Sequence, residues 1–153
     1  MTSKNDNRII AENRKARHDY FIDEVYEAGV ELFGTEVKSL RLGAVNLKDS
    51  YCEIDKGELF ALGVHISPYE QGNIFNRNPL RPKKLLMHKR EIMKLTGLVA
   101  REGFTLVPLS LYFKGSRVKM AIALCRGKKL YDKRDSIAKR DADREIERRM
   151  KNN

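Results

Sequence analysis

The sequence has little of what marks secreted, metal-binding or membrane-spanning proteins. Its two cysteines, Cys52 and Cys125, lack the C-x-x-C spacing of a zinc or redox site and are too few for a disulfide framework. The longest uninterrupted apolar run, 120–125, is six residues long, whereas a helix that spans a bilayer needs about 20. Residues 1–8 lack the apolar stretch of a signal peptide, so we expect a cytoplasmic protein without membrane contact.

Positive charge is what the sequence has in excess. Among 153 residues, 31 are Lys or Arg and 21 are Asp or Glu, which gives a net charge of +10. Hydrophobic residues make up 41%, enough to exclude a wholly disordered chain and to build one core at this length. Because the surplus charges repel one another, a polyanionic partner is favoured, with nucleic acid first. The simpler alternative is that the charges only keep a domain soluble.

The composition divides the chain into three parts. Residues 1–17 are basic and poor in apolar side chains, which predicts a flexible basic arm. Residues 18–125 contain the aromatic and β-branched runs of a folded domain, predicted to be an RNA-binding β-barrel. Residues 126–153 hold eleven Lys or Arg and six acidic residues and cannot build a core, so we expect a basic C-terminal tail.

The tail has the pattern of a conditional helix. Apolar residues recur there every four positions, at Ala138, Ala142, Ile146 and Met150. A helix with so thin an apolar stripe is marginal in water, so the tail is expected to be disordered when free and helical against a partner. The alternative is a solvated helix docked on its own barrel.

Three β-hairpins are predicted in the folded domain. The first joins 20–26 to 30–33 through a turn at Gly29, and the second joins 51–54 to 59–66, with its register left open. The third has a two-residue loop at Lys114-Gly115, which sets Phe113 opposite Ser116. In that register, alternate residues of 105–113 face the core together with those of the strand after the loop. The opposite face of the hairpin is basic and exposed to solvent.

Two helices and a long loop separate the hairpins. Thr35 is a suitable N-cap for a helix over 36–42 that Gly43 would end. A second helix is predicted over 88–101, with Gly103 as its left-handed cap. The proline-rich, basic segment 67–83 predicts a long basic loop, and loops of that length are usually functional or mobile. About six strands with interposed helices predict a mainly β fold: a small antiparallel Greek-key barrel of the oligonucleotide-binding type, with two or three short helices.

The sequence contains no recognisable catalytic or metal-binding motif. His18, His65 and His88 have no second ligand at metal spacing, and no phosphate-binding loop or hydrolase motif occurs. No enzyme activity, metal or cofactor is therefore expected, although a small RNA-processing enzyme that uses His18 or His65 is an alternative. Basic clusters instead alternate with aromatic residues that can stack on unpaired bases, namely Tyr20, Phe75 and Tyr131.

Ordered blocks along nearly the whole chain carry a family resemblance. They are Asn13-Arg14-Lys15-Ala16-Arg17-His18-Asp19-Tyr20-Phe21-Ile22, Glu27-Ala28-Gly29, Gly34-Thr35-Glu36-Val37-Lys38-Ser39-Leu40-Arg41, Asp49-Ser50-Tyr51, Lys84-Leu85-Leu86, Arg101-Glu102-Gly103-Phe104-Thr105, Leu109-Ser110-Leu111-Tyr112, and Gly127-Lys128-Lys129 followed by Asp132-Lys133-Arg134. In these blocks the sequence resembles the SsrA-binding proteins (small protein B), the bacterial partners of transfer-messenger RNA (tmRNA).

The resemblance implies an adaptor without catalysis, whose barrel grips the tRNA-like domain of tmRNA. The tail would occupy the vacant messenger channel and the decoding centre of a stalled ribosome. The elongation factor that carries aminoacylated RNA is a further expected partner, and the protein is expected to be a monomer. A general tRNA- or ribosome-binding barrel of the initiation-factor kind is the alternative.

The blocks also provide the candidate site residues. The predicted RNA-binding residues are Asn13, Arg14, Lys15, Arg17, His18, Tyr20, Glu27, Lys38, Arg41, Lys83, Lys84, Leu86, Lys128 and Lys129. The predicted ribosome-binding residues of the tail are Tyr131, Asp132, Lys133, Arg134, Ile146 and Met150.

Overall fold

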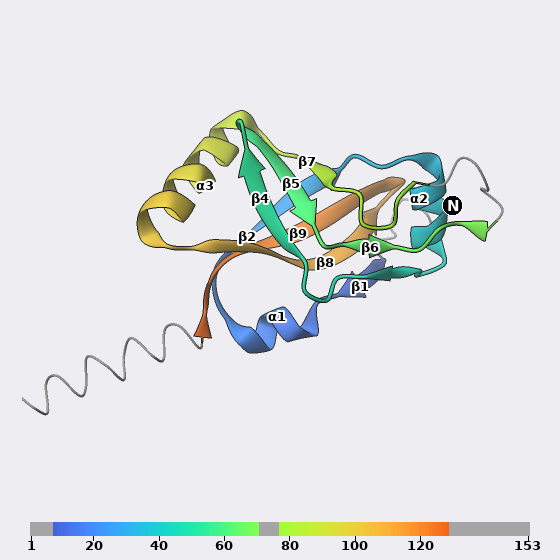
Figure 1. Cartoon of the computed structure of the whole chain (residues 1–153), viewed down its shortest axis with the longest axis horizontal. Helices are drawn as coiled ribbons and strands as arrows, with labels where there is room; N and C mark the ends of the chain where they lie inside the picture. The colour runs from blue at the N-terminus through green and yellow to red at the C-terminus, as the bar shows by residue number, and fades with distance from the viewer. Residues whose placement is uncertain (1–7, 71–76, 129–153) are drawn as a thin grey trace, which may run out of the picture.

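The computed structural model describes residues 8–70 and 77–128 (Figure 1). The predictions for the tail lie outside the described residues, as do those for Phe75 and Lys129. The helices are α1 (Arg14–Asp19), α2 (Gly34–Arg41) and α3 (Lys89–Glu102). The strands are β1 (Ile9–Glu12), β2 (Tyr20–Val30), β3 (Val45–Asn46), β4 (Tyr51–Asp55), β5 (Glu58–Leu62), β6 (His65–Ile66), β7 (Lys83–Leu86), β8 (Thr105–Lys114) and β9 (Arg117–Gly127).

Six of these strands close into a ring. Neighbours pair in the order β8-β4-β5-β7-β2-β9, and β9 pairs back with β8, always antiparallel. β1 pairs with the half of β8 that β4 leaves open, and β3 and β6 form a separate two-stranded sheet. The predicted mainly β, antiparallel fold with about six barrel strands and up to three short helices is therefore confirmed.

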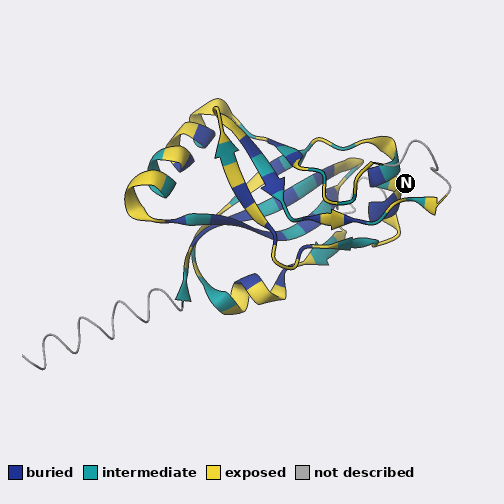
Figure 2. Ribbon diagram, in the orientation of Figure 1, coloured by how far each residue is buried: buried dark blue, intermediate teal, exposed yellow. Residues whose placement is uncertain are grey.

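The main core fills the ring. Alternate strand residues point inward, so buried and exposed positions alternate along the strands (Figure 2). α2 and α3 lie at opposite ends of the ring (Figure 1). Leu40 of α2 and Leu95 of α3 are both fully buried in this core. Each helix therefore closes one end of the barrel.

A second, smaller core lies on the outer face of the sheet under α1. Ala16 packs there against Val107, Leu109, Ala123 and Cys125. A bulge between Pro108 and Ser110 shifts the phase of β8, and both faces of 106–109 are buried. The predicted flexible arm over 1–17 is thus wrong for residues 9–17, because β1 pairs with β8 and α1 covers this cluster.

The first predicted hairpin is wrong. Residues 20–30 form one continuous strand, and Gly29 pairs with Leu86 on one side and Lys119 on the other. A Cβ on Gly29 would lie 3.4 Å from the Cβ of Leu86. Glycine here permits close packing of a neighbouring side chain and does not make a turn.

The second hairpin is confirmed, and the third is confirmed with a different register. β4 and β5 meet at Lys56-Gly57, both with positive φ, as a two-residue hairpin turn requires. In the third hairpin, Phe113 faces Val118 and not Ser116, because the loop is Gly115-Ser116 with Gly115 at φ 65°. The two-residue shift leaves Leu111 and Phe113 facing the main core, as predicted, but the bulge between Pro108 and Ser110 turns Val107 and Leu109 to the outer cluster, so the predicted core face is wrong for those two residues.

Both predicted helices occur with adjusted ends. α2 begins after Phe33, whose N–H donates to Oε1 of Glu36 at 2.8 Å, so Phe33 and not Thr35 is the N-cap residue. α3 ends at Gly103 with φ 72°, as predicted. β7 begins inside the segment predicted as a long loop, at Lys83.

Candidate nucleic-acid interface

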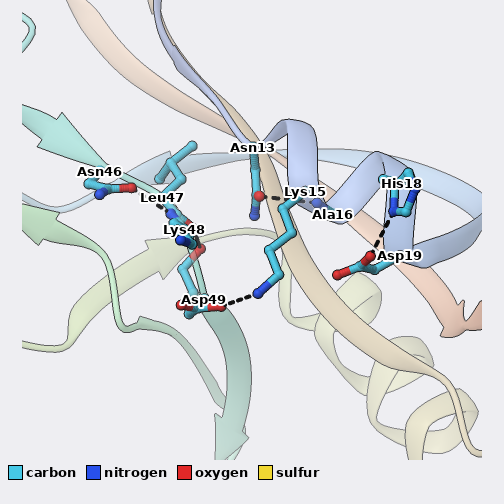
Figure 3. Close-up of polar contacts among 10 residues, drawn as sticks. Asn13, Lys15, Ala16, His18, Asp19, Asn46, Leu47, Lys48 and Asp49 are labelled. Carbon is cyan, nitrogen blue, oxygen red and sulfur yellow. Dashed lines mark hydrogen bonds and ion pairs between the residues drawn. The ribbon is translucent and has the colours of Figure 1, made fainter. Parts of the chain in front are cut away.

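Asn13 fixes α1 to the barrel. Its Oδ1 accepts from the N–H of Ala16 at 3.1 Å and caps the helix (Figure 3). Its Nδ2 donates to the carbonyl of Pro108 at 2.9 Å. The side chain is buried. Asn13 therefore supports the predicted RNA-binding surface by positioning α1, and its amide is occupied by protein contacts.

α1 presents its basic side chains to solvent. Arg14, Arg17 and His18 are exposed, and Nδ1 of His18 lies 2.9 Å from the carboxylate of Asp19 (Figure 3). Within the described part of the chain no main-chain bond holds the guanidinium groups of Arg14 and Arg17, so they can reach a phosphate in several geometries. We call the exposed cations of this helix the α1 face.

Lys15 ties α1 to the loop before β4. Its Nζ lies 2.9 Å from Oδ1 of Asp49 (Figure 3). The hydrogen bond from Lys15 lowers the pKa of the Asp49 carboxyl, and the same bond raises the pKa of Lys15. Asp49 has φ 63°, a left-handed conformation uncommon for residues other than glycine. The loop therefore holds this carboxylate against α1.

A hollow of about 370 Å³ opens between α1 and this loop. Tyr20 and Tyr51 line it together with Lys15 and Asp49. Tyr51 is half exposed and Tyr20 is partly buried. Aromatic walls beside charged groups can receive an unstacked base, which offers a ring face and hydrogen-bonding edges.

The basic surface continues from α1 onto β2 and β9. Phe21 is 41% exposed, and the ammonium of Lys128 lies 5.3 Å from its ring centroid. Arg126 lies over Phe104 at 4.8 Å and contacts Asp23 at 3.2 Å. Phe104 is buried, so Lys128 over the exposed ring of Phe21 is the pair that can bind a phosphate while the ring stacks on a base.

Glu27 lies on the outer face of the same sheet. It accepts from the hydroxyl of Tyr112 at 2.5 Å and from Nζ of Lys114 at 3.2 Å. The Tyr112 hydrogen bond is the main reason why the pKa of Glu27 is lowered. This carboxylate can accept hydrogen bonds from base amino groups but repels phosphate.

A second basic and aromatic cluster surrounds α2. Phe33 is 43% exposed, with the guanidinium of Arg77 3.9 Å and that of Arg81 4.8 Å from its ring centroid. Arg81 donates to both carboxylate oxygens of the buried Glu36, at 2.6 and 3.2 Å. Glu36 therefore fixes Arg81 beside the ring. Sequence reasoning missed Phe33 as a stacking surface, because residues more than 40 positions apart build it.

The two predicted α2 residues belong to this cluster. The ammonium of Lys38 lies 5.5 Å from the ring centroid of Tyr69. The guanidinium of Arg41 lies 5.8 Å from the ring of Phe113, and that of Arg8 lies 5.6 Å from the same ring. Both predicted residues are exposed.

The predicted contact residues of β7 lie in different environments. Lys83 is only 1% exposed and donates to the carbonyls of Val64 at 2.6 Å and Pro79 at 2.8 Å. Burial lowers its pKa to about 8. A direct RNA contact by Lys83 is therefore wrong, since its ammonium points into the protein. Lys84 pairs with Glu58 at 2.5 Å, and Leu86 is half exposed.

The described residues offer no metal centre and no membrane helix. Across 8–70 and 77–128, no three His, Cys, Asp or Glu side chains are grouped so that they could hold a metal ion. No helix in the same ranges has the length and apolar character needed to cross a membrane. The two cysteines are buried, and burial raises both thiol pKa values, that of Cys125 to about 12.

The chain is similar to proteins of one family. Residues 10–152 match the family described as SmpB protein. An SsrA-binding protein of Acetivibrio thermocellus is 60% identical over 151 residues, 99% of this chain and 98% of the relative. An SsrA-binding protein of Clostridium botulinum strain Hall is 60% identical over 99% of this chain and 97% of the relative. A solved structure described as "tmRNA-SmpB: a journey to the center of the bacterial ribosome" is 50% identical, with a TM-score of 0.64 over 77% of this chain and 83% of that one.

Proposed function

The chain belongs to the SmpB family of SsrA-binding proteins, and from this premise we propose how its surfaces divide the work of that family. It is a non-enzymatic, tmRNA-binding protein that acts in trans-translation on the ribosome. The observation that carries this function is 60% identity to an SsrA-binding protein over 99% of the chain. Neither the RNA-processing enzyme nor the initiation-factor alternative is consistent with it.

The RNA that the barrel binds is the tRNA-like domain of tmRNA. The α1 face supplies phosphate contacts through Arg14 and Arg17, and Tyr20 lines a hollow suited to an unpaired base. Lys128 and Phe21 extend this surface. A ring of antiparallel strands closed at its ends by helices suits the Greek-key barrel of the oligonucleotide-binding type, which commonly binds RNA through one face.

The tail and the remaining partners complete the proposal. Residues 129–153 enter the vacant messenger channel of a stalled ribosome, with Asp132, Lys133 and Arg134 at the decoding centre and Met150 further along the channel. Arg126 and Gly127, which the prediction assigned to the tail, are the last two residues of β9. The protein works in the cytoplasm as a monomer, beside the elongation factor that carries aminoacylated RNA.

Binding of the isolated tRNA-like domain tests the role of the α1 face. Arg14→Gln and Arg17→Gln should each reduce the slope of log affinity against log salt by about 1, because one phosphate contact is lost. Lys56→Asn removes the same charge at an exposed turn with φ 52°, which asparagine tolerates, and serves as the control. Equal losses in all three variants would mean that only net charge matters.

A full-length tail variant tests the division of labour. Replacing Asp132, Lys133 and Arg134 with alanine should abolish tagging of stalled peptides while tmRNA affinity changes by less than about threefold, since few phosphate contacts would be lost. Competition by bulk tRNA separates an adaptor for tmRNA from a general tRNA-binding barrel. Parallel loss of tagging and tmRNA binding would contradict the proposal.

A further inference from the structure

The solvent face of α3 carries a segregated positive charge that the tmRNA surface does not use. At 3.6 residues per turn, successive residues of α3 are separated by about 100° around the helix axis. Ile92 and Leu95 mark the buried side. The exposed cations fall together in an arc of about 140° on the other side. They are Lys89, Arg90, Lys94 and Arg101.

The acidic residues of α3 lie outside this arc. Glu91 and Glu102 are about 200° and 220° from Lys89 around the axis, on the flank toward the core. Among the residues that the structure describes, no ion pair involves any of the four cations. Glu58 and Lys89 interact electrostatically, but Lys84 already holds that carboxylate at 2.5 Å. The positive charge of this face is therefore not neutralised by the protein.

Gly97 lies at the centre of the arc. After proline, glycine is the least favourable residue in a helix interior. No core residue requires it, because the nearest atom to an added Cβ is the guanidinium Nη2 of Arg101, at 2.8 Å. The glycine thus lets the guanidinium of Arg101 fold back over the helix, into the space that a Cβ at position 97 would enter, so that this cation lies at the middle of the basic face.

The position and length of the face indicate what it binds. α3 lies at the end of the barrel opposite α2 (Figure 1). Its cations spread over about 18 Å from Lys89 to Arg101, which is far longer than one small anion and suits an extended phosphate backbone. Met93, 73% exposed between them, adds an apolar contact for a ribose or base.

We infer that this α3 face, made of Lys89, Arg90, Met93, Lys94, Gly97 and Arg101, is a second RNA-binding surface that contacts the phosphate backbone of ribosomal RNA. The inference rests on the proposed function, because an adaptor that carries one RNA on its α1 face has to meet the ribosome with other surfaces. The contact is non-specific in sequence, since it is made of flexible cations on phosphates.

A double variant of the full-length protein tests this surface. Lys89→Gln with Lys94→Gln keeps good helix formers on an exposed face, so the thermal midpoint should not change. With a salt slope of about 0.9 per phosphate, each contact contributes a factor of about 8 between 1 M and 0.1 M salt. Affinity for stalled ribosomes at 0.1 M salt should therefore fall about 60-fold, the product of the two factors. Lys89→Arg with Lys94→Arg is the matched control and should bind normally.

Affinity for the isolated tRNA-like domain is measured on the same variants. A change of less than twofold there, with weaker ribosome binding, supports the inference. Unchanged ribosome affinity and salt slope would overturn it, and so would an equal loss on the tRNA-like domain, which would place α3 in the tmRNA surface. Failure of the unmodified protein to bind the tRNA-like domain would instead refute the proposed function.

Gly97→Ala separates binding from folding. The substitution should raise the thermal midpoint, because alanine favours the helix, and it should weaken ribosome binding, because the added Cβ displaces the Arg101 guanidinium. A merely structural glycine would change stability alone. Unchanged ribosome affinity in a stabilised variant would therefore count against the surface.

Discussion

The buried lysine of β7 makes the stability of the barrel depend on pH in the alkaline range. The ammonium of Lys83 is enclosed, with the carbonyls of Val64 and Pro79 as acceptors, and burial lowers its pKa from 10.5 to about 8. In the unfolded chain the same group keeps its ordinary pKa. Between pH 8 and 10.5 the unfolded state therefore binds more protons than the folded state. The free energy of unfolding rises with pH in that window.

The size of the effect follows from the difference between the two pKa values. Below pH 8 both states are protonated, and burial of the charge destabilises the fold by about 3 kcal/mol, at 1.36 kcal/mol per pKa unit. That penalty is relieved as the folded-state lysine loses its proton. Integration of the linkage relation from pH 7 to pH 9.5 gives a gain of about 2 kcal/mol in stability.

Comparison with Lys83→Met isolates this contribution from other groups that titrate. Methionine has a similar length and cannot be charged, so every other pH effect cancels in the difference between the two proteins. Urea unfolding of both at pH 7, 8, 9 and 9.5 gives that difference. From pH 7 to pH 9.5, the free energy of unfolding of the unmodified protein should rise by about 2 kcal/mol relative to that of the Lys83→Met variant. A difference that stays flat, or that moves the other way, would refute a buried ammonium at this position.

Two further substitutions test the groups that position the two basic clusters. Asn13→Ala removes both the cap of α1 and the bond to Pro108, and should lower the free energy of urea unfolding by about 2 kcal/mol, whereas Asn13→Ser, whose hydroxyl oxygen can retain the cap, should lose less. If serine is as damaging as alanine, the cap is not what matters. Glu36→Gln leaves Arg81 without its buried counterion and should reduce stability by about 2 kcal/mol in the same assay, while Glu58→Gln, at the exposed pair with Lys84, should have little effect. Equal effects of the two glutamine variants would contradict the buried role of Glu36.

Local signals predicted much of the barrel because turn chemistry and strand period act over a few residues. Gly57 and Gly115 mark hairpin turns, and Gly103 ends α3 as a left-handed cap. Gly29 shows the limit of the same rule. Gly29 lies within an 11-residue strand, where the absence of a side chain leaves space for Leu86 to pack closely. A glycine near a neighbouring strand and a glycine in a turn look alike until the pairing is known.

The amino-terminal segment was misjudged for a related reason. Residues 1–17 have too few apolar side chains to form a core alone, yet Ala16 needs only a small apolar patch to cover. The bulge at Pro108 provides that patch by turning Val107 and Leu109 outward. Because the bulge lies some 90 residues away, composition within the segment could not indicate that it folds.

The basic residues of 81–84 show why charge clusters in a sequence do not define a binding surface. Arg81 is fixed by Glu36, Lys83 points into the core and Lys84 is paired with Glu58, so none of the three is a free cation. The strand period sends Lys83 and Lys84 to opposite faces, and neither direction is known before β7 is paired. On a helix, cations at spacings of three and four residues stay on one face and away from the core. The exposed positive charge that can meet RNA phosphates therefore lies on the helices, at Arg14 and Arg17 of α1, at Lys38 and Arg41 of α2, and on the α3 face, and the family resemblance did not identify the last of these.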